Sequence, residues 1–188
     1  MNKPMVGTKV AILVANGFDQ KQMTAVQRAM VAQGASVKII STDNGLVNGW
    51  DGEGWGHNFA VDAPLNTALG VDYACLVVVG GQRSLDKLKL TAHTKRFIGS
   101  FMSAQKPVAI MGDAPMLMAH VEHASGRHMT GAETSKMMAT KAGALWSDDA
   151  ICFDGNMISC ACAAEHMEEF IKTMVSHFQQ NAQIPQAA

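Results

Sequence analysis

Four short apolar runs limit what this chain can fold into more than any other feature of its sequence. Each has the length of one strand, and three are followed by a turn sequence: the runs are residues 10–14 (VAILV, before Asn16-Gly17), 37–40, 76–79 (before Gly80-Gly81) and 108–111 (before Gly112-Asp113). An uninterrupted apolar run of this length is typical of a strand buried on both faces. We therefore expect a parallel sheet that is covered on both sides.

Segments with helical spacing of apolar residues alternate with these runs. The sequence predicts helices over residues 21–33, 87–103, 114–123 and 164–178, and a hairpin of residues 151–153 and 157–160. Alternating strands and helices predict an α/β fold, a flavodoxin-like three-layer α/β/α sandwich with a mostly parallel sheet. Sites in this class lie at the carboxyl ends of the strands, so we expect the three turn sequences to converge on one crevice.

The composition predicts one domain over residues 1–188, with a core over about 8–180 and a frayed tail, 181–188. Fifteen basic and sixteen acidic residues leave a net charge of -1, which excludes a general attraction to nucleic acid or to a membrane surface. No apolar run approaches the ~20 residues of a membrane span. With no signal sequence at the start and no disulfide framework in four cysteines, we expect a cytoplasmic protein.

Four segments in order along the chain resemble the ThiJ/PfpI superfamily. They are KVAILVANGFDQKQM, LVVVGGQ, KPVAIMGDAPML and DGNMIS, and the resemblance runs from Lys9 to about Phe178. It implies the fold of the class I glutamine amidotransferases. In that family the chemistry depends on a cysteine in a strand-to-helix elbow, within a sequence such as A-I-C-H-G-P.

The elbow of this chain departs from the family pattern. It has the sequence Ala-Ile-Met-Gly-Asp-Ala-Pro over residues 109–115, and alignment on the proline places Gly112 at the cysteine and Asp113 at its histidine neighbour. The family's acidic partner falls at Asp19. A nucleophile needs a side chain with a lone pair, and Gly112 has none. We therefore expect the family's reaction to be absent at this elbow.

The Gly-Asp-Ala sequence of the elbow is also similar to that of the C-terminal domain of large-subunit catalases. That domain has the same fold, lacks the cysteine and has no established chemistry of its own. The resemblance implies a non-catalytic protein that binds a small ligand or a partner, in a setting of oxidative stress.

The residues around the expected crevice are the candidate ligand site. Backbone amides at the Gly80-Gly81 turn and after Gly112 favour a small anionic ligand, and no cofactor or metal is predicted. Asp113 is interpreted as the N-cap of the following helix, with pairing to Asp19 across the crevice as the alternative. The ligand-binding candidates are Asn16, Asp19, Gly80, Gly81, Gln82, Gly112 and Asp113.

Cys160 and Cys162 offer a second place for chemistry, because they end a strand just before the last helix. One hypothesis is a relocated reactive thiol in an enzyme with hydrolase, amidase or redox activity, in which Asp19 or Asp113 accepts the proton. The alternative is that the two small side chains pack at the sheet edge. His120 and His123 share a helix face, which we interpret as a solvated polar face rather than a metal site.

A glycine-rich segment, residues 44–59, carries Trp50 and Trp55 and interrupts the α/β pattern. We interpret it as a hairpin or loop excursion that forms either an aromatic binding surface or, as we favour, a contact between subunits. The expected assembly is a homodimer or a higher homo-oligomer. A third hypothesis for the whole chain is accordingly a structural module whose role is association.

Overall fold

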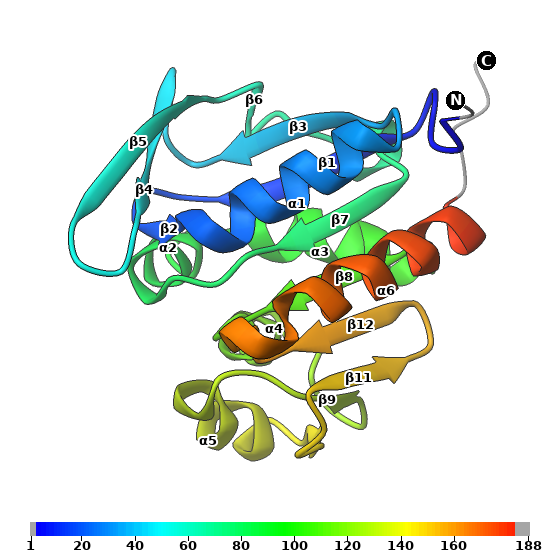
Figure 1. Ribbon diagram of the computed structural model, residues 1–188. Coiled ribbons are helices and arrows are strands. Elements are labelled where there is room, and N and C mark those ends of the chain that lie inside the picture. The colour runs from blue at the N-terminus through cyan, green and yellow to red at the C-terminus, as the bar shows by residue number, and fades with distance from the viewer. Residues whose placement is uncertain (1–2, 183–188) are drawn as a thin grey trace.

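A seven-stranded sheet forms the centre of the computed structural model, which describes residues 3–182 (Figure 1). Every neighbouring pair of strands is parallel except β11 and β12, which form the predicted hairpin. In order across the sheet the strands are β11 (Ile151–Asp154), β12 (Met157–Cys160), β8 (Val108–Met111), β7 (Cys75–Val78), β1 (Lys9–Val14), β3 (Ser36–Ser41) and β6 (Ala63–Pro64). The predicted mostly parallel α/β sheet is thus confirmed.

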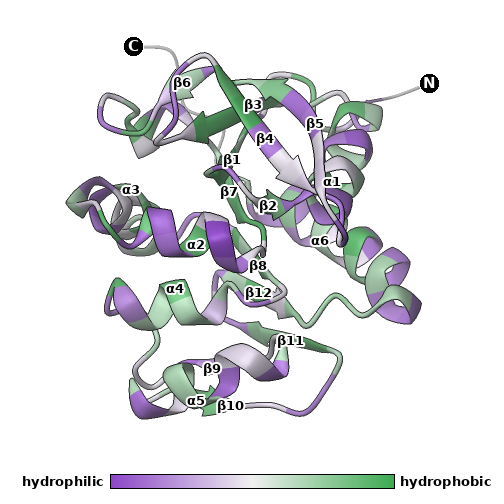
Figure 2. Ribbon diagram, turned by 90° about the vertical axis from the view of Figure 1, so that its left-hand side faces the viewer, coloured by the Kyte–Doolittle hydropathy of each residue, from purple (hydrophilic) through white to green (hydrophobic). Residues whose placement is uncertain are grey.

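Helices cover both faces of this sheet, as the two perpendicular views show (Figures 1 and 2). One face is covered by α1 (Gln20–Ala32) and α6 (Met167–Asn181), and the other by α2 (Gln82–Leu88), α3 (Ala92–Ser103) and α4 (Pro115–His120). Short helical turns, η1 (Gly70–Asp72) and η2 (Ala164–His166), precede β7 and α6. No helix within residues 3–182 is long and apolar enough to cross a membrane.

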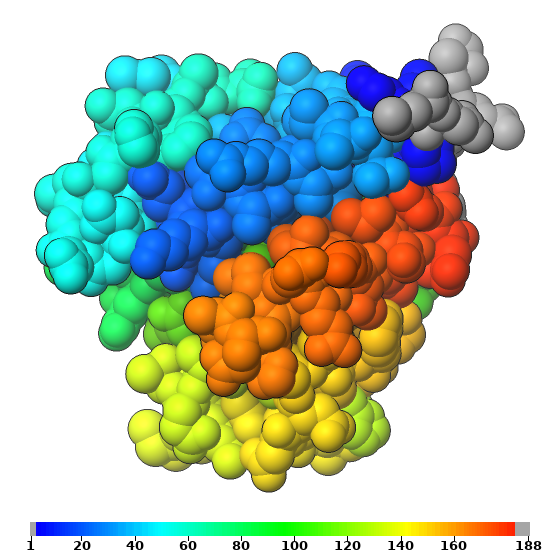
Figure 3. Space-filling model, viewed as in Figure 1, coloured from blue at the N-terminus to red at the C-terminus, as the bar shows by residue number. Residues whose placement is uncertain are grey.

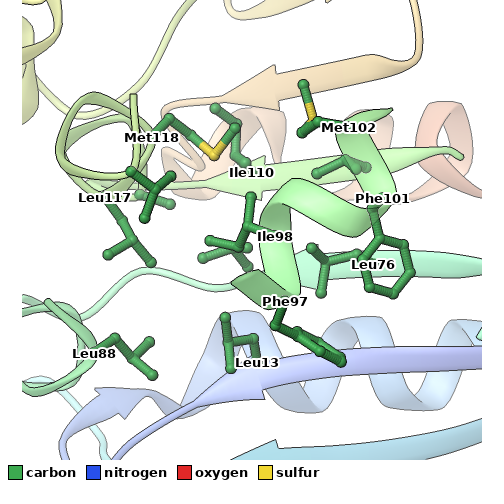
Figure 4. Close-up of a cluster of buried hydrophobic side chains, with 14 of the residues drawn as sticks. Leu13, Leu76, Leu88, Phe97, Ile98, Phe101, Met102, Ile110, Leu117 and Met118 are labelled. Carbon is green, nitrogen blue, oxygen red and sulfur yellow. The ribbon is translucent and has the colours of Figure 1, made fainter. Parts of the chain in front are cut away.

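Two hydrophobic clusters, one on each side of the sheet, hold the layers together. On the side of α2, α3 and α4, the side chains of Leu13, Leu76 and Ile110 meet Phe97 and Phe101, whose rings lie 5.2 Å apart in an edge arrangement (Figure 4). Full burial of each such side chain contributes about 1.5–3 kcal/mol. The apolar runs therefore form strands because both of their faces are needed in a core.

The second cluster lies under α1 and α6, which run side by side across the face seen in Figure 3. Met23, Val26 and Met30 of α1 and Phe170 and Met174 of α6 are fully buried against the sheet. These positions recur at helical spacing, which is why both helices were predictable.

Residues 87–103 form two helices, so the prediction of one long helix is wrong. The chain leaves α2 after Leu88, exposes Leu90 to 86%, and begins α3 at Ala92. Thr91 caps α3 by accepting a hydrogen bond from the amide of His93, at 3.2 Å. The apolar spacing continues through this segment, but the N-cap at Thr91 starts a new helix there.

Several short elements were not predicted. They include β2 (Phe18–Asp19), the edge strand β6, the small pair β9 (His128–Met129) and β10 (Leu145–Trp146), and α5 (Glu133–Lys141). The helix α5 packs on α4 and buries only Ser135 and Ala139, so its sequence lacks an apolar stripe. The predicted helix of residues 114–123 is shorter, and α6 continues to Asn181. The rest of the tail predicted to fray, residues 183–188, lies outside the described residues.

Residues 44–59 form the hairpin that their turn residues predict. Strands β4 (Leu46–Trp50) and β5 (Trp55–Ala60) are antiparallel, and β4 also pairs with β2, so the hairpin forms a three-stranded sheet of its own. It projects from one edge of the molecule (Figures 1 and 3). Trp55 on this hairpin is 57% exposed.

Candidate functional site

Residues at the carboxyl ends of β1, β7, β8 and β12 contact one another at one edge of the sheet, in a cluster that we call the crevice and define by Asp19, Gln22, the Gly80-Gly81 turn, Gly112-Asp113 and Cys162. Two backbone hydrogen bonds join its walls. The Asp19 amide donates to the Gly80 carbonyl at 2.8 Å, and the Gly112 amide donates to the Cys160 carbonyl at 2.9 Å. The expected convergence of the turn sequences is therefore observed, although Asn16 is not part of it.

The elbow between β8 and α4 turns at Gly112, which has φ +60°. This is the left-handed region, which glycine enters without the strain that an L side chain would experience. The backbone of a strained elbow is therefore present here without a side chain at its apex.

The side chain of Gln22 fills the space in front of that apex. Gln22 lies in the first turn of α1 and is only 6% exposed. A β-carbon at Gly112 would lie 2.6 Å from Nε2 of Gln22, closer than non-bonded atoms approach. The Oε1 atom of Gln22 accepts a hydrogen bond from the Gly80 amide at 2.7 Å. Sequence reasoning missed Gln22, and its only signal was a polar residue adjoining the buried Met23.

Asp113 does not cap α4, so that expectation is wrong. The N-cap position belongs to Ala114, which has no side-chain cap, and Oδ1 of Asp113 instead accepts from the Gly81 amide at 2.8 Å. Asp19 is the residue that caps a helix, since its Oδ1 accepts from the Gln22 amide at 3.0 Å. The two carboxylates are thus held by different amides.

No group of three or more His, Cys, Asp or Glu within residues 3–182 could hold a metal ion, and His120 and His123 make none.

The amides of Gly80 and Gly81, the expected anion donors, already have partners in the chain. Gln22 takes one and Asp113 takes the other. An external anion at this turn would have to displace an amide oxygen or a carboxylate oxygen that is already in hydrogen-bonding position.

Asn16 lies outside the crevice because its polar atoms tie β1 to the hairpin. Its Nδ2 donates to Asp43 at 2.9 Å, and its Oδ1 accepts from the Asn48 amide at 2.6 Å. It lines a separate open hollow together with Trp55 and Lys87.

A pocket of about 280 Å³ opens beside the crevice, between the hairpin and the start of α2. The guanidinium of Arg83 lies 4.0 Å above the ring of Trp50. The carboxylate of Asp51 accepts hydrogen bonds from the Glu53 and Gly54 amides, which lower its pKa and keep it charged. The pocket is lined by Gly17, Asp19, Lys21, Trp50, Asp51, Gly52, Gly81, Gln82 and Arg83.

Lys21 and Arg83 are the cationic groups of this pocket. Within residues 3–182, neither takes part in a salt bridge. The carboxylates of Asp19 and Asp51 line the same pocket, and Lys21 helps to lower the pKa of Asp51. Sequence reasoning selected Gln82 and Asp19 here and missed the two cationic residues and Trp50, because the hairpin that closes the pocket could not be positioned from sequence.

The Cys160 and Cys162 thiols contact each other at the edge of the crevice. Cys160 is fully buried and Cys162 is partly exposed. The Cys162 amide donates to Sγ of Cys160 at 2.9 Å, and the Cys162 thiol donates to the Cys160 carbonyl at 3.5 Å. Hydrogen bonding from Cys162 lowers the pKa of the Cys160 thiol, whereas the neighbouring Cys160 and burial raise the pKa of the Cys162 thiol. The Cys162 thiol also faces the Gly112 amide and the Asp19 carboxylate.

Comparison with known proteins assigns the chain to a family. A model of the DJ-1/PfpI family matches residues 8–177, nearly the whole fold described above. The chain belongs to the DJ-1/PfpI family. This DJ-1/PfpI protein is 26% identical over 169 residues to the deglycase PH1704 of Pyrococcus horikoshii, covering 88% of this chain and 99% of that protein. It is also 26% identical to general stress protein 18 of Bacillus subtilis, over 74% of this chain and 79% of the relative.

Solved structures show the same DJ-1/PfpI fold. A ThiJ/PfpI domain protein from Brachyspira murdochii superposes with a TM-score of 0.83 at 17% identity, covering 95% of this chain and 99% of that one. A protein from Anabaena variabilis with DJ-1/ThiJ/PfpI-like and ferritin-like domains gives a TM-score of 0.83 at 21% identity, over 96% of this chain and 52% of the two-domain protein. These similarities bear on the fold alone.

Proposed function

We propose that this DJ-1/PfpI protein has no nucleophile at its elbow and acts by binding a small anionic ligand rather than by catalysis there. The observation that carries the proposal is the pairing of Gly112 with Gln22. Gly112 supplies no reactive atom, and the amide of Gln22 occupies the place that a reactive side chain would need.

The relatives support a role in stress more than they support one reaction. One is named a general stress protein and another a deglycase. The Gly112-Asp113-Ala114 elbow also resembles the catalase C-terminal domain, which has no established chemistry of its own. We include that relation in the proposal as a reason to expect ligand binding without turnover.

The pocket beside the crevice is where we place the ligand. Arg83 offers a planar guanidinium that can bind a carboxylate or phosphate in two-point fashion, and Lys21 adds a second positive charge. The ring of Trp50 holds the Arg83 guanidinium in place, 4.0 Å above its face. A pocket of about 280 Å³ is at the lower limit of ordinary ligand sites, so the proposed ligand is small.

Turnover assays test the catalytic half of the proposal. Purified protein should show no hydrolase, glyoxalase or deglycase activity that increases in proportion to protein concentration. Sustained turnover that co-purifies with the protein through successive columns would overturn it.

Binding measurements test the other half, with citrate, acetate and inorganic phosphate as probes. At least one should raise the thermal unfolding midpoint of the wild type, and Arg83→Gln should abolish that shift. Arg28→Gln is the matched control, because Arg28 is exposed on α1 outside the pocket. If the ligand raises the unfolding midpoint of Arg83→Gln as much as that of the wild type, the ligand does not bind in this pocket.

We further propose that the protein is a homodimer or a higher homo-oligomer in the cytoplasm and that the β4–β5 hairpin lies at the subunit contact. Its exposed Trp55 supports this, since aromatic residues are enriched at interfaces. Sedimentation velocity should show an oligomer that Trp55→Lys dissociates. A wild type that stays monomeric at every concentration would contradict the proposal.

A further inference from the structure

Charges of both signs line the pocket between the hairpin and the start of α2. Arg83 and Lys21 supply two positive charges. Asp19 and Asp51 supply two negative charges. Within residues 3–182, no salt bridge joins either cation of this pocket to either carboxylate. Opposite charges that share a pocket without pairing are both satisfied by one ligand that carries both signs.

We propose that the ligand of this pocket is a small zwitterion, in which a carboxylate binds to Arg83 and an ammonium group binds to Asp51. The inference rests on the proposed function, because it names the chemical class of the ligand placed in this pocket: a carboxylate that also carries a protonated amine. A purely anionic ligand would meet the two carboxylates of the pocket as well as its two cations. A zwitterion finds an opposite charge for each of its ends.

Arg83 is positioned to receive the carboxylate. Its guanidinium lies 4.0 Å above the ring of Trp50, which holds the planar group in place. Hydrogen bonds from arginine side chains within residues 3–182 come from Arg96 and Arg127, so the N–H donors of Arg83 are left for a ligand. A β-carbon at Gly17 would lie 2.5 Å from Cβ of Arg83, so glycine at this position leaves room for the stem of Arg83. A guanidinium held in this way can bind a carboxylate at two points.

Asp51 is held at the end of β4 with one oxygen left for a ligand. Its Oδ1 atom accepts hydrogen bonds from the Gly54 amide at 3.0 Å and the Glu53 amide at 3.1 Å, which lower its pKa and keep it charged. Neither of these two amides binds its Oδ2 atom. Asp19 is less suited to the ammonium group, because its Oδ1 caps α1 and its carboxylate faces the Cys162 thiol.

Pairs of small acids that differ only in an ammonium group test the inference. Because the pocket holds about 280 Å³, short probes are used: glycine, β-alanine and γ-aminobutyrate, each compared with acetate, propionate and butyrate. Dissociation constants are measured on the whole protein at pH 7 and low ionic strength, from the NMR shifts of its backbone amides. We expect at least one amino acid to bind about two- to five-fold more tightly than its partner, which is the gain from one exposed ion pair.

Single variants assign the ammonium group to Asp51. Asp51→Asn keeps an oxygen for the Glu53 and Gly54 amides but loses the charge, so it should bind both members of a pair equally. Arg83→Gln should lose binding of both members. Asp148→Asn is the control, because it removes an exposed carboxylate outside the pocket with the same change in net charge, and it should keep the wild-type preference.

The results separate this inference from the proposed function. If the acids without an ammonium group bind through Arg83 as tightly as the amino acids do, the inference is wrong and the proposed function stands. The inference is also wrong if the preference for the amino acid persists in Asp51→Asn. If no carboxylate of either kind binds the wild type, the proposed function fails and the inference fails with it.

Discussion

Gly112 and Gln22 act as one unit, since the side chain of one occupies the volume that the other leaves free. The sequence identified Gly112 because its neighbours resemble a known elbow. It could not identify Gln22, which reaches the Gly80 amide across 58 residues of chain. A contact between residues so far apart in the sequence leaves no local pattern. The position of the crevice could therefore be predicted, but not that Gln22 fills it.

Restoring a thiol at the elbow should therefore fail unless Gln22 is shortened. We expect Gly112→Cys to lower the free energy of unfolding by about 1–3 kcal/mol because the Gln22 side chain must move and leave the Gly80 amide without its acceptor, in addition to about 1 kcal/mol for the positive φ. Gly126→Cys is the matched control, because it has φ +73° and open space around its β-carbon. Urea unfolding of both variants measures the difference, and equal losses would contradict the overlap.

The double variant completes this test. Gln22→Ala alone should cost about 1–3 kcal/mol, because the buried Gly80 amide loses its acceptor. Combined with Gly112→Cys, the total loss should be smaller than the sum of the two single losses. Strict additivity would show that the two positions do not share a space.

Among the elements, the central strands were predictable because their apolar runs are complete, whereas α2, α5 and the start of α3 were not. The break at Leu90 depends on a cap, and α5 depends on packing against α4 rather than on an apolar stripe. Local chemistry at a helix start can thus divide a segment that periodicity presents as continuous.

The cap of α3 gives a prediction at this scale. Thr91→Ala should lower the free energy of unfolding by about 1 kcal/mol, because the His93 amide loses its acceptor. Thr91→Ser keeps the hydroxyl and should lose much less. Urea unfolding measures both, and similar losses for Ala and Ser would show that the methyl group matters instead of the cap.

For the whole molecule, the buried strand β7 makes stability depend on alkaline pH. Burial raises the pKa of the Cys75 thiol to about 12 from its ordinary 9.0. Above pH 9 the thiol ionises in the unfolded chain but stays protonated in the folded protein. The folded state then binds more protons, so the free energy of unfolding falls as pH rises from about 9 to 12.

Cys75→Ala should remove this dependence. At pH 10 the wild type should lose about 1.4 kcal/mol through Cys75 relative to pH 7, and the variant should not. At pH 7 the variant should have a lower free energy of unfolding than the wild type, because the substitution leaves a cavity. This difference between the two proteins should become smaller as pH rises. Lys106, whose pKa is lowered by burial, acts in the opposite direction, and because Cys75 raises that pKa electrostatically the comparison also includes the change at Lys106. A difference in the free energy of unfolding that is the same at pH 7 and pH 10 would contradict the prediction.

The hydrogen bond from the Gly81 amide to Asp113 makes that carboxylate a tethered ligand of the Gly80-Gly81 turn. Any free carboxylate competes there against one that is present at high effective concentration. Asp113→Ala removes the carboxylate and leaves the Gly81 amide without its acceptor. Acetate in solution should then bind at this turn and recover part of the stability that the variant loses. In the wild type acetate should have no effect at this turn, because Asp113 already occupies the amide. The carboxylate of Asp113 thus occupies the amide that an external anion would need at this turn, which leaves Arg83 and Lys21 in the neighbouring pocket as the anion site that we propose.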